Sequence, residues 1–179
     1  MQKIPTIFIR DDADRAHVTA EPNPECAWVF DGEGVATRKY DGTCVMYDGV
    51  RWWARREVKP GKRAPDGFVP LGTDDVTGKT VGWEPADQSS YVRYLNEASA
   101  HYGFRAGTYE LCGPKVNGNP EDFKCHVVIS HEGAEQYPDA PRAYEGLRAF
   151  LATFTGEGLV WHHPDGRMAK IKRRDFPHL

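Results

Sequence analysis

The sequence predicts an α+β domain with mainly antiparallel sheets. Short runs of β-branched and apolar residues are separated by turn pairs such as Asp31-Gly32 and Asp48-Gly49, which is the pattern of strands joined as hairpins. Two segments have the spacing of apolar residues that a helix needs. The chain has 179 residues, of which 40% are hydrophobic, and this is enough for the core of one domain. Strands outnumber helices, so sheets should dominate the fold.

The first 80 residues predict mostly extended structure. Residues 1–25 are polar and contain three prolines, so we expect an extended N-terminal arm. Residues 27–57 alternate strand-like runs with Asp-Gly turns, which predicts a β-meander. Residues 58–80 are rich in proline and glycine, and this composition predicts a long surface loop with one short strand.

The remaining residues predict two helices among further strands. A helix is expected over 89–102, with Asp87 or Ser89 as its cap and Gly103 after its end. A second helix is expected over 142–154, with Pro141 in its first turn. The other apolar runs predict strands over 106–112, 125–130, 158–163 and 167–172.

Composition excludes several classes of protein. No apolar run approaches the roughly 18 residues that a membrane span requires, and the N-terminus lacks the layout of a signal peptide. No two cysteines form a C-x-x-C pair, which disfavours zinc and redox sites. The chain therefore predicts a cytoplasmic protein with free thiols, two of them in apolar runs where we expect burial as small hydrophobes. The cysteines are Cys26, Cys44, Cys112 and Cys125.

The formal net charge of −3 argues against a protein that coats nucleic acid without selectivity, but two basic clusters interrupt it. One cluster lies at 51–63, and a solvated surface is the favoured interpretation for three of its residues, Lys59, Lys62 and Arg63. The other lies at 167–174. Within it, Lys170-Ile171-Lys172 lies in a predicted strand, so both amines should point to one face and Ile171 to the other. Two ammonium groups on one face favour binding of an anion such as a polyphosphate.

The stretch Lys39-Tyr40-Asp41-Gly42-Thr43 is the most informative part of the chain. It joins two strand-like runs, and Gly42 permits a tight turn or a close approach of the backbone. A lysine amine at such a junction can meet an electrophile in a pocket and form a covalent intermediate. A K-x-D-G match alone is weak, because the same residues also serve as ordinary turn residues.

Three further motifs follow in order along the chain, and together with the first they form a specific series. The four motifs are K-x-D-G-T at 39–43, Y-E-L-C-G-P at 109–114, E-G-L-V at 157–160 and K-I-K at 170–172. The series resembles the covalent nucleotidyltransferase superfamily of ligases and RNA-capping enzymes. Thr43, together with the strings YELCGPKVNGNP and HHPDGRMAKIKRRDF, resembles the ATP-dependent 5′-to-3′ RNA ligases within it. The resemblance covers residues 39–175.

The resemblance implies a fold, a reaction and a cofactor set. The fold is a nucleotidyltransferase domain of the ATP-grasp-like ligase adenylation type, spanning 1–179 with flanking helices and no appended C-terminal OB or other domain. The implied reaction adenylates Lys39 with ATP, transfers AMP to the 5′-phosphate of an RNA and seals that end to a 3′-hydroxyl. The cofactors are ATP as the AMP donor and Mg²⁺ or Mn²⁺. The implied partner is RNA with 5′-phosphate and 3′-hydroxyl ends.

The resemblance also assigns roles to individual residues. Lys39 is the nucleophile, and Lys170 and Lys172 would neutralise the phosphates of the nucleotide. Glu157 would hold the divalent metal, directly or through water. Glu110 would accept hydrogen bonds from the ribose hydroxyls.

Several assignments stay open between two interpretations. Arg55 resembles the arginine that follows the lysine motif in the family, and it is preferred over Arg56 as the contact to the nucleotide or the 5′-phosphate. Neighbouring strand residues face opposite ways, so only one of the two should reach the site. Asp41 has a catalytic or metal role or simply braces its turn. Glu110 is otherwise a solvent-facing strand residue, and Glu157 a loop carboxylate. Lys115 and Asn117 hold substrate phosphates or are plain loop residues, and at most one of His162 and His163 faces the site.

Three other functions remain alternatives to an RNA ligase. A GTP-dependent capping-type guanylyltransferase is disfavoured by Thr43 and by the short C-terminus. A DNA ligase would carry similar motifs. A non-catalytic protein that binds nucleic-acid ends would not need the lysine, both glutamates and K-I-K. A lone domain without an evident clamp also suggests a homo-oligomer or another protein that helps to hold the RNA.

Overall fold

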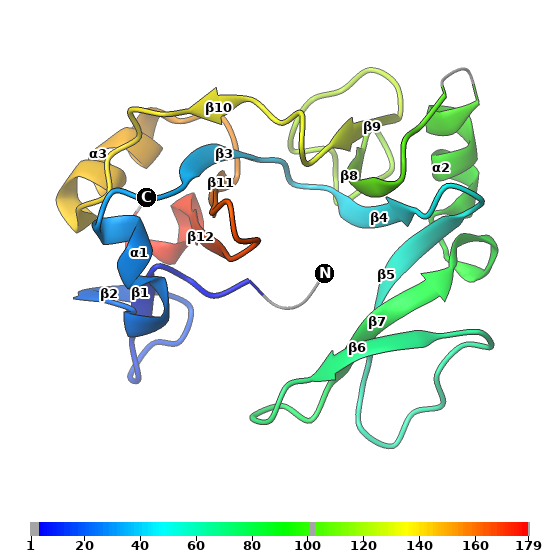
Figure 1. Cartoon of the computed structure of the whole chain (residues 1–179), viewed down its shortest axis with the longest axis horizontal. Helices are drawn as coiled ribbons and strands as arrows, with labels where there is room; N and C mark the ends of the chain where they lie inside the picture. Colours follow the sequence, from blue (N-terminus) through cyan, green and yellow to red (C-terminus); the bar gives the residue numbers. More distant parts are fainter. Residues whose placement is uncertain (1–3, 101–102, 179) are drawn as a thin grey trace. The chain divides into compact units, whose positions relative to one another are not determined.

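The computed structural model describes residues 4–100 and 103–178, which form two compact units. Residues 41–133 form the central unit, and residues 4–40 with 134–178 form the terminal unit. Both units contain antiparallel sheets and short helices, so the predicted α+β class with mainly antiparallel sheets is confirmed (Figure 1). Among the described residues, no helix is both long and apolar enough to cross a lipid bilayer.

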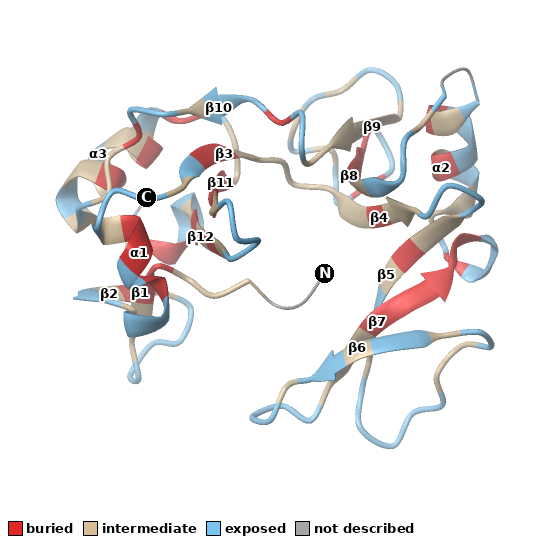
Figure 2. Ribbon diagram, viewed as in Figure 1, coloured by how far each residue is buried: buried red, intermediate tan, exposed pale blue. Residues whose placement is uncertain are grey.

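The central unit is built on one six-stranded antiparallel sheet in the order β6-β7-β5-β4-β8-β9. Helix α2 (Val92–Ser99) packs Leu95 and Ala98 against apolar side chains of β4 and β8 in a core of their own. β6 is largely exposed whereas β7 beside it is buried along most of its length (Figure 2). The strands are β4 (Thr43–Tyr47), β5 (Trp52–Val58), β6 (Val69–Thr73), β7 (Thr80–Pro85), β8 (Gly107–Cys112) and β9 (Val127–Ser130), and a 3₁₀ turn η2 (Ala86–Gln88) follows β7.

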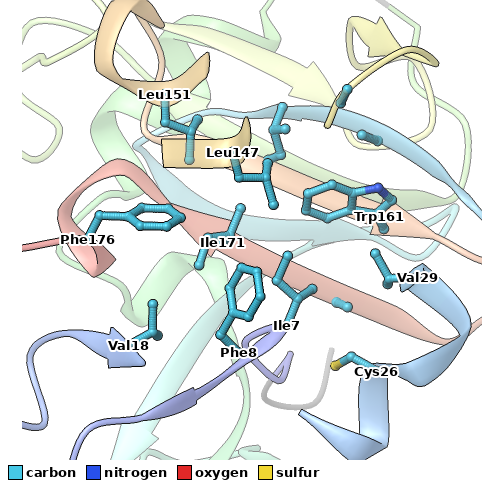
Figure 3. Packing of buried hydrophobic residues seen from close by; sticks show 14 of the residues in the cluster. Ile7, Phe8, Val18, Cys26, Val29, Leu147, Leu151, Trp161, Ile171 and Phe176 are labelled. Atoms are coloured by element: carbon cyan, nitrogen blue, oxygen red, sulfur yellow. The ribbon is translucent and has the colours of Figure 1, made fainter. Parts of the chain in front are cut away.

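The terminal unit contains a four-stranded antiparallel sheet in the order β10-β3-β11-β12 and a separate β1-β2 hairpin. Figure 3 shows side chains from α3, β1 and β12 meeting in its hydrophobic core. Its strands are β1 (Phe8–Arg10), β2 (Val18–Pro22), β3 (Val35–Lys39), β10 (Gln136–Tyr137), β11 (Gly158–His162) and β12 (Met168–Lys172). Its helical segments are η1 (Pro24–Cys26), α1 (Ala27–Phe30), α3 (Tyr144–Thr153) and η3 (Arg173–Asp175).

The expected N-terminal arm is wrong for its described part, residues 4–25. Ile7 and Phe8 are buried in the core, and Phe8 packs against the rings of Phe30 and Tyr144. The backbone amide of Ile7 donates to the carbonyl of Lys170 at 3.0 Å, and the amide of Lys170 donates to Pro5. The segment before β1 therefore runs alongside β12 and fixes the backbone at Lys170. Its apolar patch, Ile7-Phe8-Ile9, is short, and the polar residues around it masked its role.

The predicted helices exist but are shorter than expected. Residues 86–88 form a 3₁₀ turn and Ser89 is extended, so the first helix begins at Val92 rather than at Ser89. The last two residues of the predicted range, 101–102, lie outside the described residues. The second helix begins at Tyr144, so Pro141 precedes it. Residues 27–30 form α1 instead of the start of the predicted meander, because Trp28 and Val29 bury on one side of a single turn.

Replacing Phe8 with alanine tests whether the N-terminal hairpin is part of the core. Phe8→Ala should lower the free energy of unfolding by about 3–5 kcal/mol, because a buried ring leaves a cavity among aromatic neighbours. Val76→Ala is the control, since Val76 is 86% exposed and should change stability by less than about 0.5 kcal/mol. Urea unfolding monitored by circular dichroism measures both. Equal stability of the two variants would mean that these residues are an arm after all.

Candidate functional site

Lys39 lies at the end of β3, directly across the sheet from Gly158 of β11. Gly158 in turn lies opposite Lys172 of β12. Side chains that are directly opposite in a sheet share a face, so Lys39 and Lys172 project from the same face with Gly158 between them. A Cβ atom at Gly158 would overlap the carbonyl oxygen of Ile171 and the Cα atom of Lys172. The glycine therefore lets the three strands approach closely at this point.

The alternation predicted for Lys170-Ile171-Lys172 agrees with the structure. Ile171 is fully buried in the core of the terminal unit, and the two lysines project from the opposite face of β12. Lys170 lies opposite Val160, and Val160 lies opposite Thr37 of β3. Lys170 thus belongs to the next row along the same face as Lys39 and Lys172.

Glu157 immediately precedes β11 and holds this group of lysines together. One of its carboxylate oxygens pairs with the amine of Lys39 and the other with the amine of Lys172. Arg174 lies 3.6 Å from the second oxygen. Burial raises the pKa of the Glu157 carboxyl, but Lys39 and Lys172 outweigh this effect and the pKa lies below its ordinary value. Glu157 is therefore a buried carboxylate that bridges two lysines, and the alternative of a solvated loop carboxylate does not describe it.

Lys170 is the lysine whose protonated form is penalised most clearly. Burial, followed by repulsion from Lys172 and Lys39, lowers the pKa of Lys170 to about 8. Its backbone is held between β11 and the segment before β1. Burial and the two neighbouring amines thus make the protonated form of Lys170 less favourable than that of a solvated lysine.

Two residues that support this face were not identified from the sequence. Asp175, in the turn after β12, accepts a hydrogen bond from the backbone amide of Lys172 at 2.9 Å. Its other oxygen pairs with Arg10 of β1 at 2.8 Å. The short spacing from Lys172 to Asp175 is the signal for the first contact. Nothing in the sequence pattern pointed to Arg10, which lies 165 residues away.

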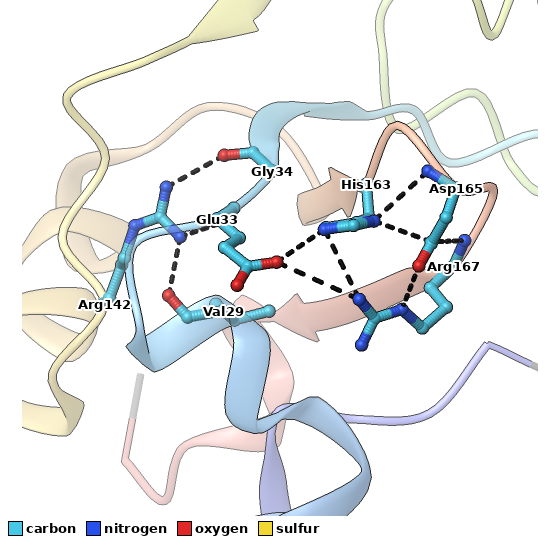
Figure 4. Close-up of polar contacts among 7 residues, drawn as sticks. All are labelled: Val29, Glu33, Gly34, Arg142, His163, Asp165 and Arg167. Carbon is cyan, nitrogen blue, oxygen red and sulfur yellow. Dashed lines mark hydrogen bonds and ion pairs between the residues drawn. The ribbon is translucent and has the colours of Figure 1, made fainter.

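A polar network holds the loops on either side of β3 and β11. Arg142, just before α3, donates hydrogen bonds to the carbonyls of Val29, Glu33 and Gly34 (Figure 4). His163 contacts the carboxylates of Glu33, at 2.5 Å, and Asp165, at 2.7 Å. These contacts fix the start of β3 and the end of β11, the two strands that present Lys39 and Gly158.

The two adjacent histidines separate as the strand geometry predicts. His162, the last residue of β11, lies two rows from Gly158 on the face that carries the lysines, and its Nε2 is 3.1 Å from the hydroxyl of Thr37. His163 lies beyond the strand in the network of Figure 4. At most His162 therefore shares the face of Lys39, and the two histidines do not form a joint metal site.

Glu110 lies in the central unit, on a different body from the lysines. It is 9% exposed, so it is not a solvent-facing strand residue. Its Oε1 accepts a hydrogen bond from the amide of Gly42 at 3.2 Å, and its Oε2 is 3.0 Å from Nε2 of His131. Cys44 is its direct partner on β4. The partnership with His131 was not predicted, because it depends on the pairing of β8 with β9.

Strand pairing distinguishes Arg55 from Arg56. Trp53 of β5 lies opposite Met46 of β4, so Arg55, two residues on, shares the face of Cys44 and Glu110. Arg56 projects from the other face, where it lies 3.8 Å from the buried carboxylate of Glu84. The two arginines therefore face opposite ways, as alternation along the strand predicts, and the choice of Arg55 as the nucleotide contact stays a prediction.

Asp41 and Gly42 are braced by the loop after β8. The side-chain amide of Asn117 donates to the carbonyl of Gly42 at 2.6 Å and lies 3.4 Å from a carboxylate oxygen of Asp41. The backbone amide of Asp41 donates to Glu121 at 3.0 Å. A Cβ atom at Gly42 would overlap the carbonyl of Leu111, so only glycine fits. Contacts from Asn117 and Glu121 therefore hold the turn at Asp41 and Gly42, and a catalytic or metal role of Asp41 stays a prediction.

The predicted site residues thus fall into two groups. The terminal unit brings together Lys39, Glu157, Lys170 and Lys172 on one sheet face. The central unit contains Asp41, Arg55 and Glu110, of which Arg55 and Glu110 share a face. Lys115 is exposed, and its amide donates to His126. The chain passes from the first group to the second between Tyr40 and Asp41.

The lowered pKa of Lys170 predicts a specific pH dependence of stability. Below about pH 8 both folded and unfolded chains carry the proton, and the folded state bears the full cost of the buried charge. Between about 8 and 10.5 the unfolded chain binds a proton that the folded chain has released, so the contribution of Lys170 to the unfolding free energy rises with pH. Lys170→Met should therefore stabilise the protein at pH 7, and its advantage should shrink toward pH 10.

Urea unfolding of both proteins at a series of pH values measures this difference. Lys59→Met, at an exposed lysine, is the matched control and should parallel the wild type throughout. Parallel curves for wild type and Lys170→Met would contradict the crowded environment of Lys170.

Comparison with known proteins relates the chain to RNA ligases. It is 25% identical over 217 residues to a rat (Rattus norvegicus) protein named RNA ligase 1, covering 78% of this chain and 66% of that protein. The mouse (Mus musculus) RNA ligase 1 is 25% identical, covering 78% and 65%, and that of Pongo abelii is 27% identical, covering 68% and 50%. No protein-family model matches the chain. The chain thus spans two thirds or less of the length of these relatives, and the similarity supports a relationship to RNA ligases.

Proposed function

We propose that the chain is an ATP-dependent RNA ligase that joins a 5′-phosphate to a 3′-hydroxyl through a Lys39-AMP intermediate. The observation that carries the proposal is the row Lys39-Gly158-Lys172 with Glu157 between the two amines. This row places the lysine of a K-x-D-G-T motif beside Lys172, with Lys170 in the next row of the same sheet face, where a polyphosphate would neutralise the lysines. The similarity to proteins named RNA ligase 1 supports RNA as the strand that is joined.

The proposed reaction consists of three phosphoryl transfers. The Lys39 amine attacks the α-phosphorus of ATP, a P–N bond forms, the amine loses a proton and pyrophosphate leaves. A 5′-phosphate oxygen of RNA then attacks the lysyl-AMP phosphorus, the P–N bond breaks and an adenylated 5′ end results. A 3′-hydroxyl finally attacks the 5′-phosphorus, a phosphodiester forms and AMP departs with the bonding electron pair. Such transfers depend mainly on positioning and on neutralised charge.

Glu157 would position the nucleophile. Its two oxygens hold the amines of Lys39 and Lys172, so the approach of Lys39 toward a phosphate bound near Lys172 is fixed before the nucleotide arrives. Lys170 and Lys172 would contact the phosphates, since both project from the same face. Once Lys39 is adenylated it no longer carries a charge, and one oxygen of Glu157 loses its partner.

The donors at this site fit a divalent ion held by the Glu157 carboxylate together with phosphate oxygens. Mg²⁺ accepts one or two carboxylates together with waters and phosphate oxygens, so Glu157 would hold Mg²⁺ or Mn²⁺ with a polyphosphate supplying further oxygens. When bound, the ion would neutralise charge on the phosphates. Both oxygens of Glu157 already pair with lysines, so the ion would have to share these oxygens with Lys39 and Lys172.

The residues of the central unit would bind the nucleoside and the strand. Glu110 has its carboxylate fixed by Gly42 and His131, and such a group would accept hydrogen bonds from ribose hydroxyls. Arg55, on the same face, would contact the nucleotide or the 5′-phosphate. Asp41 would act mainly by keeping the turn after Lys39 in shape.

Labelling with ATP tests the nucleophile. The pure protein with Mg²⁺ and α-labelled ATP should give a labelled band on a denaturing gel. Lys39→Ala should give none, because the proposed P–N bond forms with the amine of Lys39. Lys59→Ala is the matched control and should label normally. A labelled Lys39→Ala protein would move the nucleophile elsewhere, and a band with α-labelled GTP alone would indicate capping chemistry. Labelling that persists in excess EDTA would contradict the metal role of Glu157 without affecting that of Lys39.

The row of lysines predicts a ranking of two neighbouring cations. Lys172→Ala should reduce adenylation more than Arg174→Ala, because Lys172 contacts Glu157 from within the sheet face and Arg174 is a largely exposed neighbour at 3.6 Å. A difference of about tenfold or more in labelling rate is expected for one phosphate contact of about 1.4 kcal/mol or more. Equal rates in a time course of the two variants would refute the proposed contact of Lys172 with the phosphates of the nucleotide.

A further inference from the structure

We propose that Cys44, Glu110 and His131 form a zinc site on the central unit. The three side chains come from three adjacent strands or strand ends. Cys44 of β4 is the direct cross-strand partner of Glu110 of β8. His131 follows β9, and its backbone amide donates to the carbonyl of Thr108, two residues before Glu110 on the same strand. Residues that are opposite one another, or two apart, share a face of the sheet, so all three project from one side.

The donor atoms lie close enough to share one ion. The sulfur of Cys44, an oxygen of Glu110 and a ring nitrogen of His131 all lie within 4.8 Å of one another. Around a tetrahedral zinc ion, with bonds of about 2.0–2.3 Å, neighbouring donor atoms are separated by about 3.3–3.7 Å. The Glu110–His131 contact, at 3.0 Å, is already as short as such a pair. Small movements of side chains would therefore complete the three-ligand arrangement.

The kind of donor selects the kind of metal. A thiolate, an imidazole and a carboxylate together suit Zn²⁺, whereas Mg²⁺ prefers oxygen donors alone. Three protein ligands leave a fourth position for water or another small ligand. Cys44 and His131 are partly exposed, so an ion can enter from solvent. Binding would convert the Cys44 thiol to a thiolate and release its proton.

The surroundings of the three residues resemble the supporting contacts of a metal site. His131 places its Nε2 toward Glu110 and its Nδ1 at 2.9 Å from the hydroxyl of Thr108. A histidine that binds a metal through one nitrogen usually donates from the other nitrogen to an oxygen, which fixes the ring. Glu110 is likewise fixed, since its Oε1 accepts a hydrogen bond from the amide of Gly42. The widely spaced cysteines contain no C-x-x-C pair, so only the strand pairing reveals this cluster.

Occupation of the site would have a consequence for ligation, and this part rests on the proposed function. The ion would take the oxygen of Glu110 that a ribose hydroxyl would otherwise approach. Zn²⁺ and nucleotide should then exclude one another, and zinc should lower the adenylation of Lys39 although it binds on the other unit's residues.

Cobalt(II) titration tests the site without any ligase activity. The reduced protein, residues 1–179, is freed of metal and titrated with Co²⁺, whose visible and sulfur-to-metal absorption reports a tetrahedral site with a thiolate. The wild type should develop this absorption and Zn²⁺ should displace it. Cys44→Ser and His131→Gln should lose it, while Thr108→Val should weaken binding about tenfold, as loss of a supporting contact does. Thermal melts confirm that each variant is folded.

Cys125→Ser is the matched control, because Cys125 is an exposed thiol outside the cluster and its loss should leave the absorption unchanged. Absence of the absorption in the wild type, its loss in Cys125→Ser or its persistence in folded Cys44→Ser would each overturn the proposed site.

Adenylation at buffered free Zn²⁺ tests the consequence separately. With ATP far below saturation and free Zn²⁺ at about ten times its dissociation constant, roughly one site in eleven stays free of zinc, so labelling of the wild type should fall about tenfold, and that of Cys44→Ser should not. Equal inhibition of both proteins would contradict the competition. If no variant labels at all, the proposed function fails, and the cobalt spectrum still decides whether the site exists.

Discussion

The arrangement of the candidate site depends on one buried carboxylate. Lys39, Lys172 and Arg174 all approach Glu157, and Lys170 lies in the next row of the same sheet face. Without a counter-charge, these cations would repel one another at close range. Glu157 compensates only part of their charge, so the face keeps an excess of positive charge that suits a polyphosphate. Burial is the largest cause of the low pKa of Lys170, and repulsion from Lys172 and Lys39 lowers this pKa further.

The register of the strands brings residues that are far apart in the sequence together on this face. Lys39 and Glu157 are separated by 118 residues, yet β3, β11 and β12 pair so that Lys39, Gly158 and Lys172 form one row. A shift of one residue in either pairing would send one lysine into the hydrophobic core. The core opposes such a shift, because Leu159, Trp161 and Ile171 on the other face are fully buried. Packing on one side of the sheet thus fixes the positions of the lysines on the other side.

The local part of this arrangement could be predicted from the sequence. Alternation along K-I-K predicted which side chains share a face, and alternation along β5 correctly separated Arg55 from Arg56. The α+β class followed from short strand-like runs and hairpin turns. Each of these predictions depends on residues within one strand or turn, where geometry is set by neighbouring residues.

The long-range part could not be predicted in this way. The contacts of Asp175 with Arg10, of Glu157 with Lys39 and of His131 with Glu110 depend on which strands pair and in which register. The burial of Phe8 had the same origin, since a short apolar patch among polar residues gives no sign of the core that it joins. The pattern of a single sequence indicates which residues of a strand share a face, but it does not indicate the order of the strands in a sheet.

The location of the AMP group tests the central claim most directly. Protein incubated with ATP and Mg²⁺ can be digested under conditions that preserve the P–N bond, and the modified peptide sequenced by mass spectrometry. The account predicts AMP on Lys39 and its removal by added pyrophosphate, which reverses the first step. AMP on Lys170 or Lys172, or an unmodified Lys39 in protein that neither takes up AMP from ATP nor releases ATP when pyrophosphate is added, would contradict it.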